Sequence, residues 1–459
     1  MKLRKIYTSA GILLLSLFCI GDAVAKDAKF ETGVSFGSTG ADEPYSSLTD
    51  KDGNYYISGT CRGDVEFAGG ATIKGRGGMD AVIVKYDAEL NFLWARVVGG
   101  SKDDTFERIA VTSAGDIVAV GKISGDVTID GTDQTLSGTQ STDGCIVVYD
   151  KDGNYKSSAQ IKAAGASLCY SVAVDKSGNI FVTGSTVGAT DFGNEKTVTI
   201  EGSSPGTFLA CYNNSLVCQW AIAGSSPVQS YGWAVNFDKE ENILLTGRFG
   251  TTFTITGTDG EALTTAVGSE SSQDTYVAKL SHEGVGQWIT YVTNSNRIDT
   301  RSIDSDSQGN VYIWGHCQSA VTPEGQSPLG FNGNFDSFLI KYSSAGAYLD
   351  GMNLGGSGRD EAKSLFVDAD DNIYVAGNVN GDGSKGGTAV NMNPRGESKD
   401  YTFKGHDGYV AKYNGSTWEL MQLEKTVTPD NANHQPQDRY SGDSSCCHSP
   451  YRSRNGYWL

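Results

Sequence analysis

The sequence has few of the residues that most active sites and metal centres require. Only five of its 459 residues are histidines, and no Gly-x-Ser-x-Gly sequence marks a nucleophile elbow. Basic residues are also scarce, with 36 lysines and arginines against 54 acidic residues and a net charge of −18. Nucleic acids and anionic membranes attract basic surfaces, so this charge argues against both as partners. No cofactor and no metal are indicated.

Cysteines are few and do not recur at one position of the chain. Nine cysteines in 459 residues are not the pattern of a disulfide-stabilised scaffold. One pair differs, because Cys211 and Cys218 flank a short polar turn at 213–216. Folding a hairpin about 214–215 brings the two cysteines opposite each other. They form the one disulfide that we predict for an exported chain.

Long hydrophobic runs are missing except near the first residue. Residues 12–20 are apolar, follow three basic residues and precede the small residues at 23–25. This run is too short to span a bilayer stably and predicts a cleaved secretory signal peptide over 1–25. A lipoprotein signal ending at Cys19 is the rival interpretation, which the bulky Phe18 opposes. We therefore expect an exported protein (periplasmic, at the cell surface or secreted) without a transmembrane segment after cleavage.

What the sequence does contain is a short motif written six times. Each copy is an apolar strand end, a polar turn and a second strand that closes on glycine, as in 368–377. The closing residues are Gly59, Gly121, Gly184, Gly247, Gly315 and Gly377. The intervals between them are 62, 63, 63, 68 and 62 residues. So constant a period indicates a repeat architecture.

Each unit is expected to contain four short strands, which we name A to D in chain order. In the first unit they lie near 46–50, 54–59, 80–86 and 92–98, and the turn between A and B contains Asp-Gly-Asn, which is typical of hairpins. When the six units are aligned, one position of strand A holds small residues, which suit a strand crowded near a central axis. They are Ser46, Ser171, Ala234, Ser302 and Ser364, with Arg108 as the exception. Four-stranded units arranged radially are the blades of a β-propeller.

The predicted fold class is therefore all-β, a single β-propeller of four-stranded antiparallel blades. We expect the propeller to cover residues 31–424 with six blades, one for each repeat. Seven blades is the alternative, because residues 31–37 read like a displaced strand D that closes the ring against the last blade. Residues 425–459 lose the alternation of apolar and polar residues, so we expect a disordered tail there.

The repeated residues resemble the SBBP repeat of bacterial extracytoplasmic β-propellers. The shared pattern is Asp-x-x-Gly-Asn-x-Tyr-Val-x-Gly, then Asp-Ala-x-Val-x-Lys-Tyr, then Trp-Ala and Gly-Gly. The resemblance covers about 33–424 and implies a propeller, with seven blades rather than the six units counted above. It implies little about function, because one fold hosts many functions.

Residues that recur from unit to unit are expected to serve folding. The aspartates that open strand C should cap their own turns or tie neighbouring blades. The Asp-Lys-Asp-Gly-Asn runs at 50–54 and 150–154 lack the later ligands of an EF-hand loop, so we interpret them as turns between strands A and B. The strand D tryptophans should pack between blades. They are Trp94, Trp220, Trp288 and Trp418.

Candidate binding residues are those that break the repeat. Acidic pairs stand where one blade passes to the next, and the B–C connections of blades four (248–273) and six (378–406) are the longest. Both kinds of connection leave from one face of a propeller, and loops on a rigid scaffold carry most binding sites. The candidates are Asp42, Glu43, Asp103, Asp104, Arg248, Arg359, Asp360, Glu361 and His406.

These observations favour an exported, monomeric binding module whose partner is a protein or a glycan. A catalytic propeller, such as a polysaccharide hydrolase or lyase, is the alternative, because carboxylates on one face could serve a glycosidase. A purely structural module of the cell surface, for example in adhesion, is the third hypothesis. No motif of the sequence points to catalysis.

Overall fold

A computed structural model describes residues 36–38, 40–67, 70–266, 273–380, 388–397, 400–403 and 406–425. The predicted signal peptide at 1–25 lies outside these residues, as does all but the first residue of the predicted tail at 425–459. The described part of the chain folds entirely into strands, turns and bends. It contains no helix of the length and hydropathy that crossing a membrane requires. The predicted all-β class is confirmed.

Most strands belong to six antiparallel four-stranded units, which we call blades one to six. Blade one contains β2 (Glu43–Thr49), β3 (Tyr55–Cys61), β6 (Asp80–Tyr86) and β7 (Phe92–Gly100). Blade two contains β8 (Thr105–Val111), β9 (Ile117–Ile129), β10 (Thr135–Tyr149) and β11 (Tyr155–Ala163). Blade three contains β12 (Ser167–Val174), β13 (Ile180–Thr186), β16 (Gly206–Tyr212) and β17 (Cys218–Ser225).

The other three blades repeat this order. Blade four contains β18 (Ser230–Phe237), β19 (Ile243–Phe249), β22 (Asp274–Leu280) and β23 (Gly286–Thr293). Blade five contains β24 (Ile298–Ser305), β25 (Val311–Cys317), β27 (Asp336–Tyr342) and β28 (Tyr348–Leu354). Blade six contains β29 (Arg359–Val367), β30 (Ile373–Asn380), β33 (His406–Tyr413) and β34 (Leu420–Lys425).

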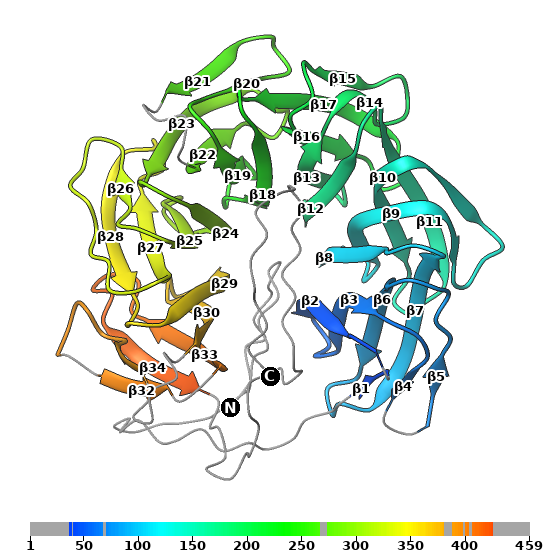
Figure 1. Cartoon of the computed structure of the whole chain (residues 1–459), viewed down its shortest axis with the longest axis horizontal. Coiled ribbons are helices and arrows are strands. Elements are labelled where there is room, and N and C mark those ends of the chain that lie inside the picture. The colour runs from blue at the N-terminus through cyan, green and yellow to red at the C-terminus, as the bar shows by residue number, and fades with distance from the viewer. Residues whose placement is uncertain are drawn as a thin grey trace, which may run out of the picture.

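The first strand of each blade lies innermost, and the blades stand side by side around a common axis (Figure 1). Successive inner strands touch, from β2 to β8, β12, β18, β24 and β29. The hydrophobic core fills the spaces between neighbouring sheets, with residues of blades two and three, for example, in one cluster. Among the described residues, β29 and β2 make no contact of comparable extent. Blades one and six are therefore the two ends of the row.

The repeated aspartate of the A–B turn closes that turn. In blade six Asp368 accepts hydrogen bonds from the backbone N–H of Asp370 (3.0 Å) and Asn372 (2.8 Å), and from the hydroxyl of Tyr374 (3.2 Å). These contacts explain why Asp, Asn and Tyr recur together. The prediction that such runs form turns is confirmed. The run at 150–154 joins strands C and D of blade two, however, and not strands A and B as we predicted.

The six repeated glycines lie opposite a β-bulge in strand A. In every blade, the register between strands A and B skips one strand A residue next to the residue that pairs with this glycine. A Cβ atom on any of the six would lie 1.8–2.6 Å from a backbone oxygen of strand A. Only glycine permits this approach, so the glycine recurs for a steric reason.

The B–C connections form clamps between blades rather than free loops. They contain β4 (Val65–Phe67) and β5 (Thr72–Ile73), β14 (Gly188–Asp191) and β15 (Thr197–Ile200), β20 (Thr252–Thr256) and β21 (Ala262–Ala266), β26 (Thr322–Pro323), and β31 (Thr388–Asn391) and β32 (Asp400–Phe403). Strands β14, β20 and β26 pair with strand D of the preceding blade, and in blade two the extended β9 does so itself. The short β1 (Phe36–Gly37) pairs with β4.

Strand D tryptophans add to the same interfaces, as predicted. The indole N–H of Trp94 donates to the carbonyl of Lys151 in the next blade (3.2 Å), and that of Trp288 donates to the carbonyl of Ser344 (3.0 Å). Strand C aspartates close nearby turns, since Asp80 accepts from the backbone N–H of Arg76 at 2.7 Å. These repeated residues serve folding.

The predicted disulfide between Cys211 and Cys218 is not formed. Both cysteines are buried free thiols. A bulge beside the C–D turn shifts the register, so Cys211 pairs with Trp220 and Cys218 pairs with Tyr212. Neighbouring strand positions point to opposite faces of a sheet. The two thiols accordingly belong to different core clusters.

Candidate functional site

The β-bulge in strand A of each blade turns one side chain out of the regular alternation of the strand. A bulge adds a residue and redirects its side chain, and bulges are frequent beside functional sites. The register skips one residue in each blade, and this residue has a large side chain. In five of the six blades the small residue of strand A follows it directly. The skipped residues are Tyr45, Glu107, Tyr170, Trp233, Arg301 and Lys363, which we call the bulge ring.

The bulge ring faces the middle of the molecule. The guanidinium of Arg108, beside Glu107 on β8, donates to the backbone carbonyl of Arg301 on β24 at 3.4 Å. Strands β8 and β24 belong to blades on opposite sides of the axis (Figure 1). Arg108 therefore reaches across the ring, which accounts for its place as the exception in the column of small residues.

Three aromatic side chains from blades three and four form one side of this inner surface. Tyr231 and Trp233 stack with ring centroids 5.6 Å apart and an angle of 16° between the planes. Tyr170 lies 4.4 Å from Trp233. The guanidinium of Arg248 lies 4.7 Å from the ring centroid of Tyr231, and that of Arg301 lies 5.1 Å from that of Trp233. We call Tyr170, Tyr231 and Trp233 the aromatic trio.

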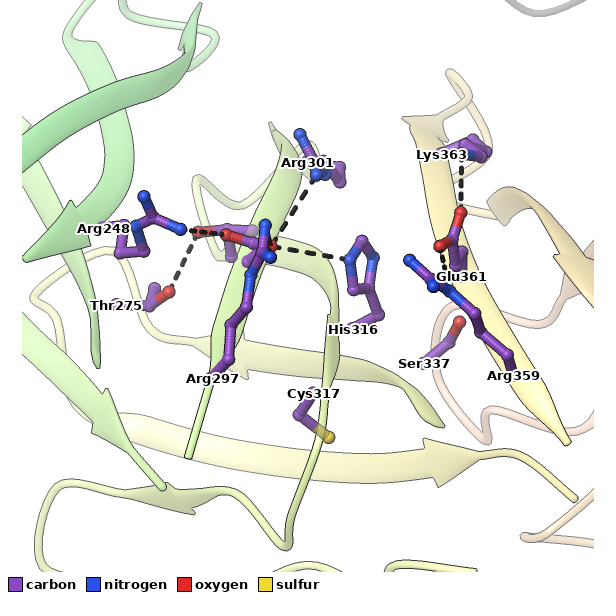
Figure 2. Close-up of polar contacts among 12 residues, drawn as sticks. Arg248, Thr275, Arg297, Arg301, His316, Cys317, Ser337, Arg359, Glu361 and Lys363 are labelled. Carbon is purple, nitrogen blue, oxygen red and sulfur yellow. Dashed lines mark hydrogen bonds and ion pairs between the residues drawn. The ribbon is translucent and has the colours of Figure 1, made fainter. Parts of the chain in front are cut away.

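The carboxylate of Asp299 on β24 pairs with several basic side chains next to this trio. Its carboxylate lies 3.3 Å from Arg248, 2.7 Å from Arg297 and 3.7 Å from Arg301, and it is fully buried. Arg248, Arg297, Arg301 and His316 surround this carboxylate on different sides (Figure 2). Burial would raise the pKa of Asp299, but the three guanidinium groups outweigh it and hold the pKa well below its ordinary value.

His316 lies between this group and a second carboxylate (Figure 2). Its ring is 3.7 Å from Asp299 and only 2% of the residue is exposed. Burial, and then the charge of Arg301, lower the pKa of His316 to about 3. The imidazole is therefore neutral at physiological pH. We call Asp299, Arg248, Arg297, Arg301 and His316 the Asp299 cluster.

Glu361 of β29 is the second carboxylate. It pairs with Arg359 at 2.6 Å and with Lys363 at 2.9 Å. Burial opposes ionisation of Glu361, but its ion pairs with Lys363, the larger effect, and with Arg359 lower its pKa to about 2. The carboxylates of Asp299 and Glu361 are thus both ionised and both held by cations.

The structure brings four of the predicted site residues to this inner surface. Arg248 belongs to the Asp299 cluster, and Arg359 and Glu361 form a pair beside it. Glu43 accepts a hydrogen bond from the hydroxyl of Tyr45 in the bulge ring at 2.7 Å. The side chain of His406 lies outside the described part of the molecule.

The other four predicted residues are turn carboxylates. Asp42 accepts from the backbone N–H of Ser38 (2.6 Å), and Asp103 from that of Met79 (2.8 Å). Asp104 accepts from the N–H groups of Gly100 and Ser124, and Asp360 from that of Gly356. Each bond closes or ties a connection between blades. We no longer place these four aspartates in the site.

Sequence reasoning missed the aromatic trio and most of the Asp299 cluster. The sequence did contain an indication of them. The position directly before that of the small residues in strand A holds a large side chain in each unit, and its chemical type varies between units. A position that is large in every unit but holds five residue types in six units is not explained by blade packing. The described residues include no group of three or more His, Cys, Asp or Glu side chains suited to a metal ion.

Stability should depend on pH through buried turn carboxylates. Burial is the largest cause that raises the pKa of Asp104 and of Asp360 to about 7, above the ordinary 3.8. The folded protein then binds more protons than the unfolded chain between about pH 4 and 7, so stability falls as pH rises through this window. We expect the melting temperature to be several degrees higher at pH 5 than at pH 8. Asp360→Asn should reduce that difference, and equal melting temperatures of the unmodified protein would contradict it.

Comparison with known proteins agrees with this architecture. Residues 158–193 match the SBBP family, described as a β-propeller repeat, and they run from strand D of blade two into blade three. An uncharacterized WD repeat-containing protein of Acanthamoeba polyphaga mimivirus is 22% identical over 435 residues, covering 77% of this chain. The match spans 31% of that longer relative. The chain is therefore a β-propeller repeat protein. It carries the SBBP repeat whose pattern its sequence resembles.

A solved structure was also found. It is the crystal structure of a protein of unknown function from Bacteroides caccae, with 12% sequence identity and a TM-score of 0.24. The similarity covers 61% of this chain and 92% of that one.

Proposed function

We propose that this chain is an exported binding module that recognises a glycan on its inner surface. The observation that carries the proposal is the aromatic trio beside the Asp299 cluster. Stacked aromatic rings offer flat faces to the apolar faces of sugar rings, and neighbouring charged groups offer hydrogen bonds to hydroxyl groups. Binding sites combine these two kinds of surface, whereas blade packing requires neither at this position.

The location of the proposed site differs from the one that the sequence favoured. The long B–C connections had been expected to form a binding rim. Because β20 pairs with strand D of blade three, the length of the connection in blade four has a structural explanation. The inner strands carry the variable residues instead, which favours the inner surface.

The catalytic alternative needs one protonated and one ionised carboxyl group near each other. Asp299 and Glu361 are both held ionised by their cations, so neither suits the role of general acid. Glu107 is the one carboxyl group of the bulge ring, and burial raises its pKa. A hydrolase would therefore have to use Glu107. Release of reducing ends from a bound glycan, lost in Glu107→Gln, would favour the hydrolase over the binding module.

The remaining parts of the proposal concern location and assembly. Export rests on the basic, apolar and small residues of 1–25, which would deliver the chain to the periplasm, the cell surface or the medium. The net charge of −18 disfavours nucleic acid as a partner. We propose a monomer. A dimer in light scattering of the mature chain would contradict this part.

We further propose a ring with seven positions, the alternative to the six blades predicted first. β1 pairs with the B–C hairpin of blade one. In the same way, strand D of each of the first four blades pairs with strand B or the B–C connection of the next blade. These D strands are β7, β11, β17 and β23. This pairing makes β1 the end of a strand D that precedes blade one. Within the described residues, β29 and β2 lack the contact that joins the other neighbouring inner strands, which agrees with an additional position between them. A crystal structure with six evenly spaced blades in a closed ring would contradict it.

A glycan array probed with the mature chain tests the proposed function. We expect binding to a defined group of glycans that is lost in Trp233→Ala, because this ring lies at the centre of the aromatic trio. Trp220→Ala is the matched control, since Trp220 lies on the outer part of blade three and packs against Phe181. Both variants are compared below their melting temperatures. Equal loss in both variants, or no glycan bound at all, would contradict the proposal.

A further inference from the structure

The inner surface carries excess positive charge although the chain as a whole is strongly acidic. Among the described residues around Asp299 and Glu361, six cationic side chains accompany three carboxylates, because Glu107 and Arg108 also interact with Arg301. The cations are Arg108, Arg248, Arg297, Arg301, Arg359 and Lys363. The neutral His316 adds none. A ligand at this surface therefore meets a positive potential, although the chain has a net charge of −18.

Arg301 is the point where these positive charges meet. Its guanidinium lies 3.7 Å from the carboxylate of Asp299. Its backbone carbonyl accepts a hydrogen bond from the guanidinium of Arg108, which comes from the opposite side of the ring. Its charge also disfavours protonation of His316 and of Arg108. Like charges held this close repel each other, and an anion placed among them removes the repulsion.

Several buried donors on the same surface have no hydrogen-bond partner within the described part of the chain. They are Nε of Arg108, Nε1 of Trp233 and Nε of Arg248, and one of the two unpartnered ring nitrogens of the neutral His316 is a donor as well. Arginine and indole nitrogens only donate, so oxygen atoms must satisfy them. A buried donor without an acceptor costs free energy. Excess charge and unmet donors are independent observations, and both call for an anionic, oxygen-rich ligand.

The cations adjoin the aromatic trio directly. Arg301 is a quarter exposed and lies 5.1 Å from the ring centroid of Trp233, while Lys363 is nearly half exposed on the neighbouring blade. A ligand whose ring stacks on Trp233 can therefore present a substituent to both cations. Guanidinium groups bind carboxylates through two parallel hydrogen bonds, which fixes their orientation.

From these contacts we propose that the glycan is acidic, with a uronic acid ring on Trp233 and its carboxylate between Arg301 and Lys363. This inference rests on the proposed function and names the ligand class for the same site. A neutral sugar would leave the positive charge unbalanced. A larger polyanion would use charge alone and would not need the aromatic trio.

Calorimetry of the mature chain with two matched probes tests the inference. The probes are a tetramer of galacturonic acid and its fully methyl-esterified, neutral form. We expect the acidic probe to bind at least tenfold more tightly, and to weaken as salt rises from about 0.05 to about 0.5 M, since salt screens exposed charges. Arg301→Met should lose at least tenfold in affinity for the acidic probe. Lys363→Met should do the same and serves if the first variant does not fold.

Arg62→Met is the matched control, because Arg62 is half exposed and pairs with Asp103 outside the inner surface. It should bind like the unmodified chain. Equal affinity for both probes, lost in Trp233→Ala, would overturn the acidic ligand and leave the proposed function intact. So would binding of neutral array glycans without either tetramer. Tight binding of a sulfated polymer but not of galacturonate would replace the carboxylate with sulfate and overturn the inference. Absence of binding to every glycan would overturn both proposals.

Discussion

Replacing Asp299 by alanine is expected to lower the free energy of unfolding by about 3–5 kcal/mol, the usual cost of removing one partner of a buried charge pair. Asp299 is fully buried and is the carboxylate on which Arg248, Arg297 and Arg301 converge. Without it, three guanidinium groups and the edge of His316 face one another with no counter-charge. Electrostatic repulsion and lost hydrogen bonds act in the same direction, so the effect should be large.

Urea denaturation followed by fluorescence measures this loss. Asp299→Asn should be less damaging than Asp299→Ala, since an amide oxygen still accepts a hydrogen bond although the charge is gone. Asp152→Ala is the control, because Asp152 pairs with Lys151 at 2.8 Å on the exposed C–D turn of blade two. Exposed pairs contribute little, so this variant should unfold like the unmodified protein. An Asp299→Ala protein as stable as the control would show that the cluster is not held by its carboxylate.

The architecture could be predicted because each blade must solve the same packing problem. Gly247 recurs as Gly59 or Gly377 since a Cβ atom at each place would meet the backbone of strand A. Asp368 recurs with Asn372 because one carboxylate closes the turn that both share. Such requirements leave a period in the sequence, and a period can be read without any knowledge of the ligand.

The inner surface could not be predicted in the same way because its residues differ from blade to blade. Glu107, Trp233 and Arg301 occupy one position of the repeat and share no chemistry. Which of them meet depends on the order of blades around the axis and on bulges that no local pattern announces. Arg108 was noticed as an exception to the small column, yet its reach to the opposite blade appears only in three dimensions.

The disulfide prediction failed because a regular hairpin was assumed. The Cys211–Cys218 disulfide depended on a ladder without a bulge, and one extra residue beside the turn moved each thiol to a different face. The B–C connections were read as free because they are long. Each contains an apolar side chain that is buried in the structure, such as Phe67 in blade one and Phe253 in blade four. Those apolar residues were the sequence signal for a clamp.

Replacing Phe253 by alanine is expected to cost about 3–5 kcal/mol of stability, as for other buried phenylalanines. Phe253 lies on β20, the B–C hairpin of blade four, and is fully buried. Its ring stacks on Tyr276 of the same blade with centroids 4.0 Å apart and planes 11° apart. The next buried residue of the hairpin, Ile255, pairs with Gly224 in blade three. Losing the ring should leave a cavity at the contact between two blades.

The decisive comparison sets this loss of stability against ligand binding. Thr254→Ala changes the next residue, which is only half buried and bonds Thr264 across the hairpin, so it should alter stability by less than about 1 kcal/mol. Because the hairpin is a clamp outside the inner surface, Phe253→Ala should still bind the glycan with unchanged affinity below its melting temperature. The opposite result would be a Phe253→Ala protein that loses binding while its free energy of unfolding changes by less than about 1 kcal/mol. In that case the B–C connections form the binding surface. The inner surface would then be only the packed centre of the ring.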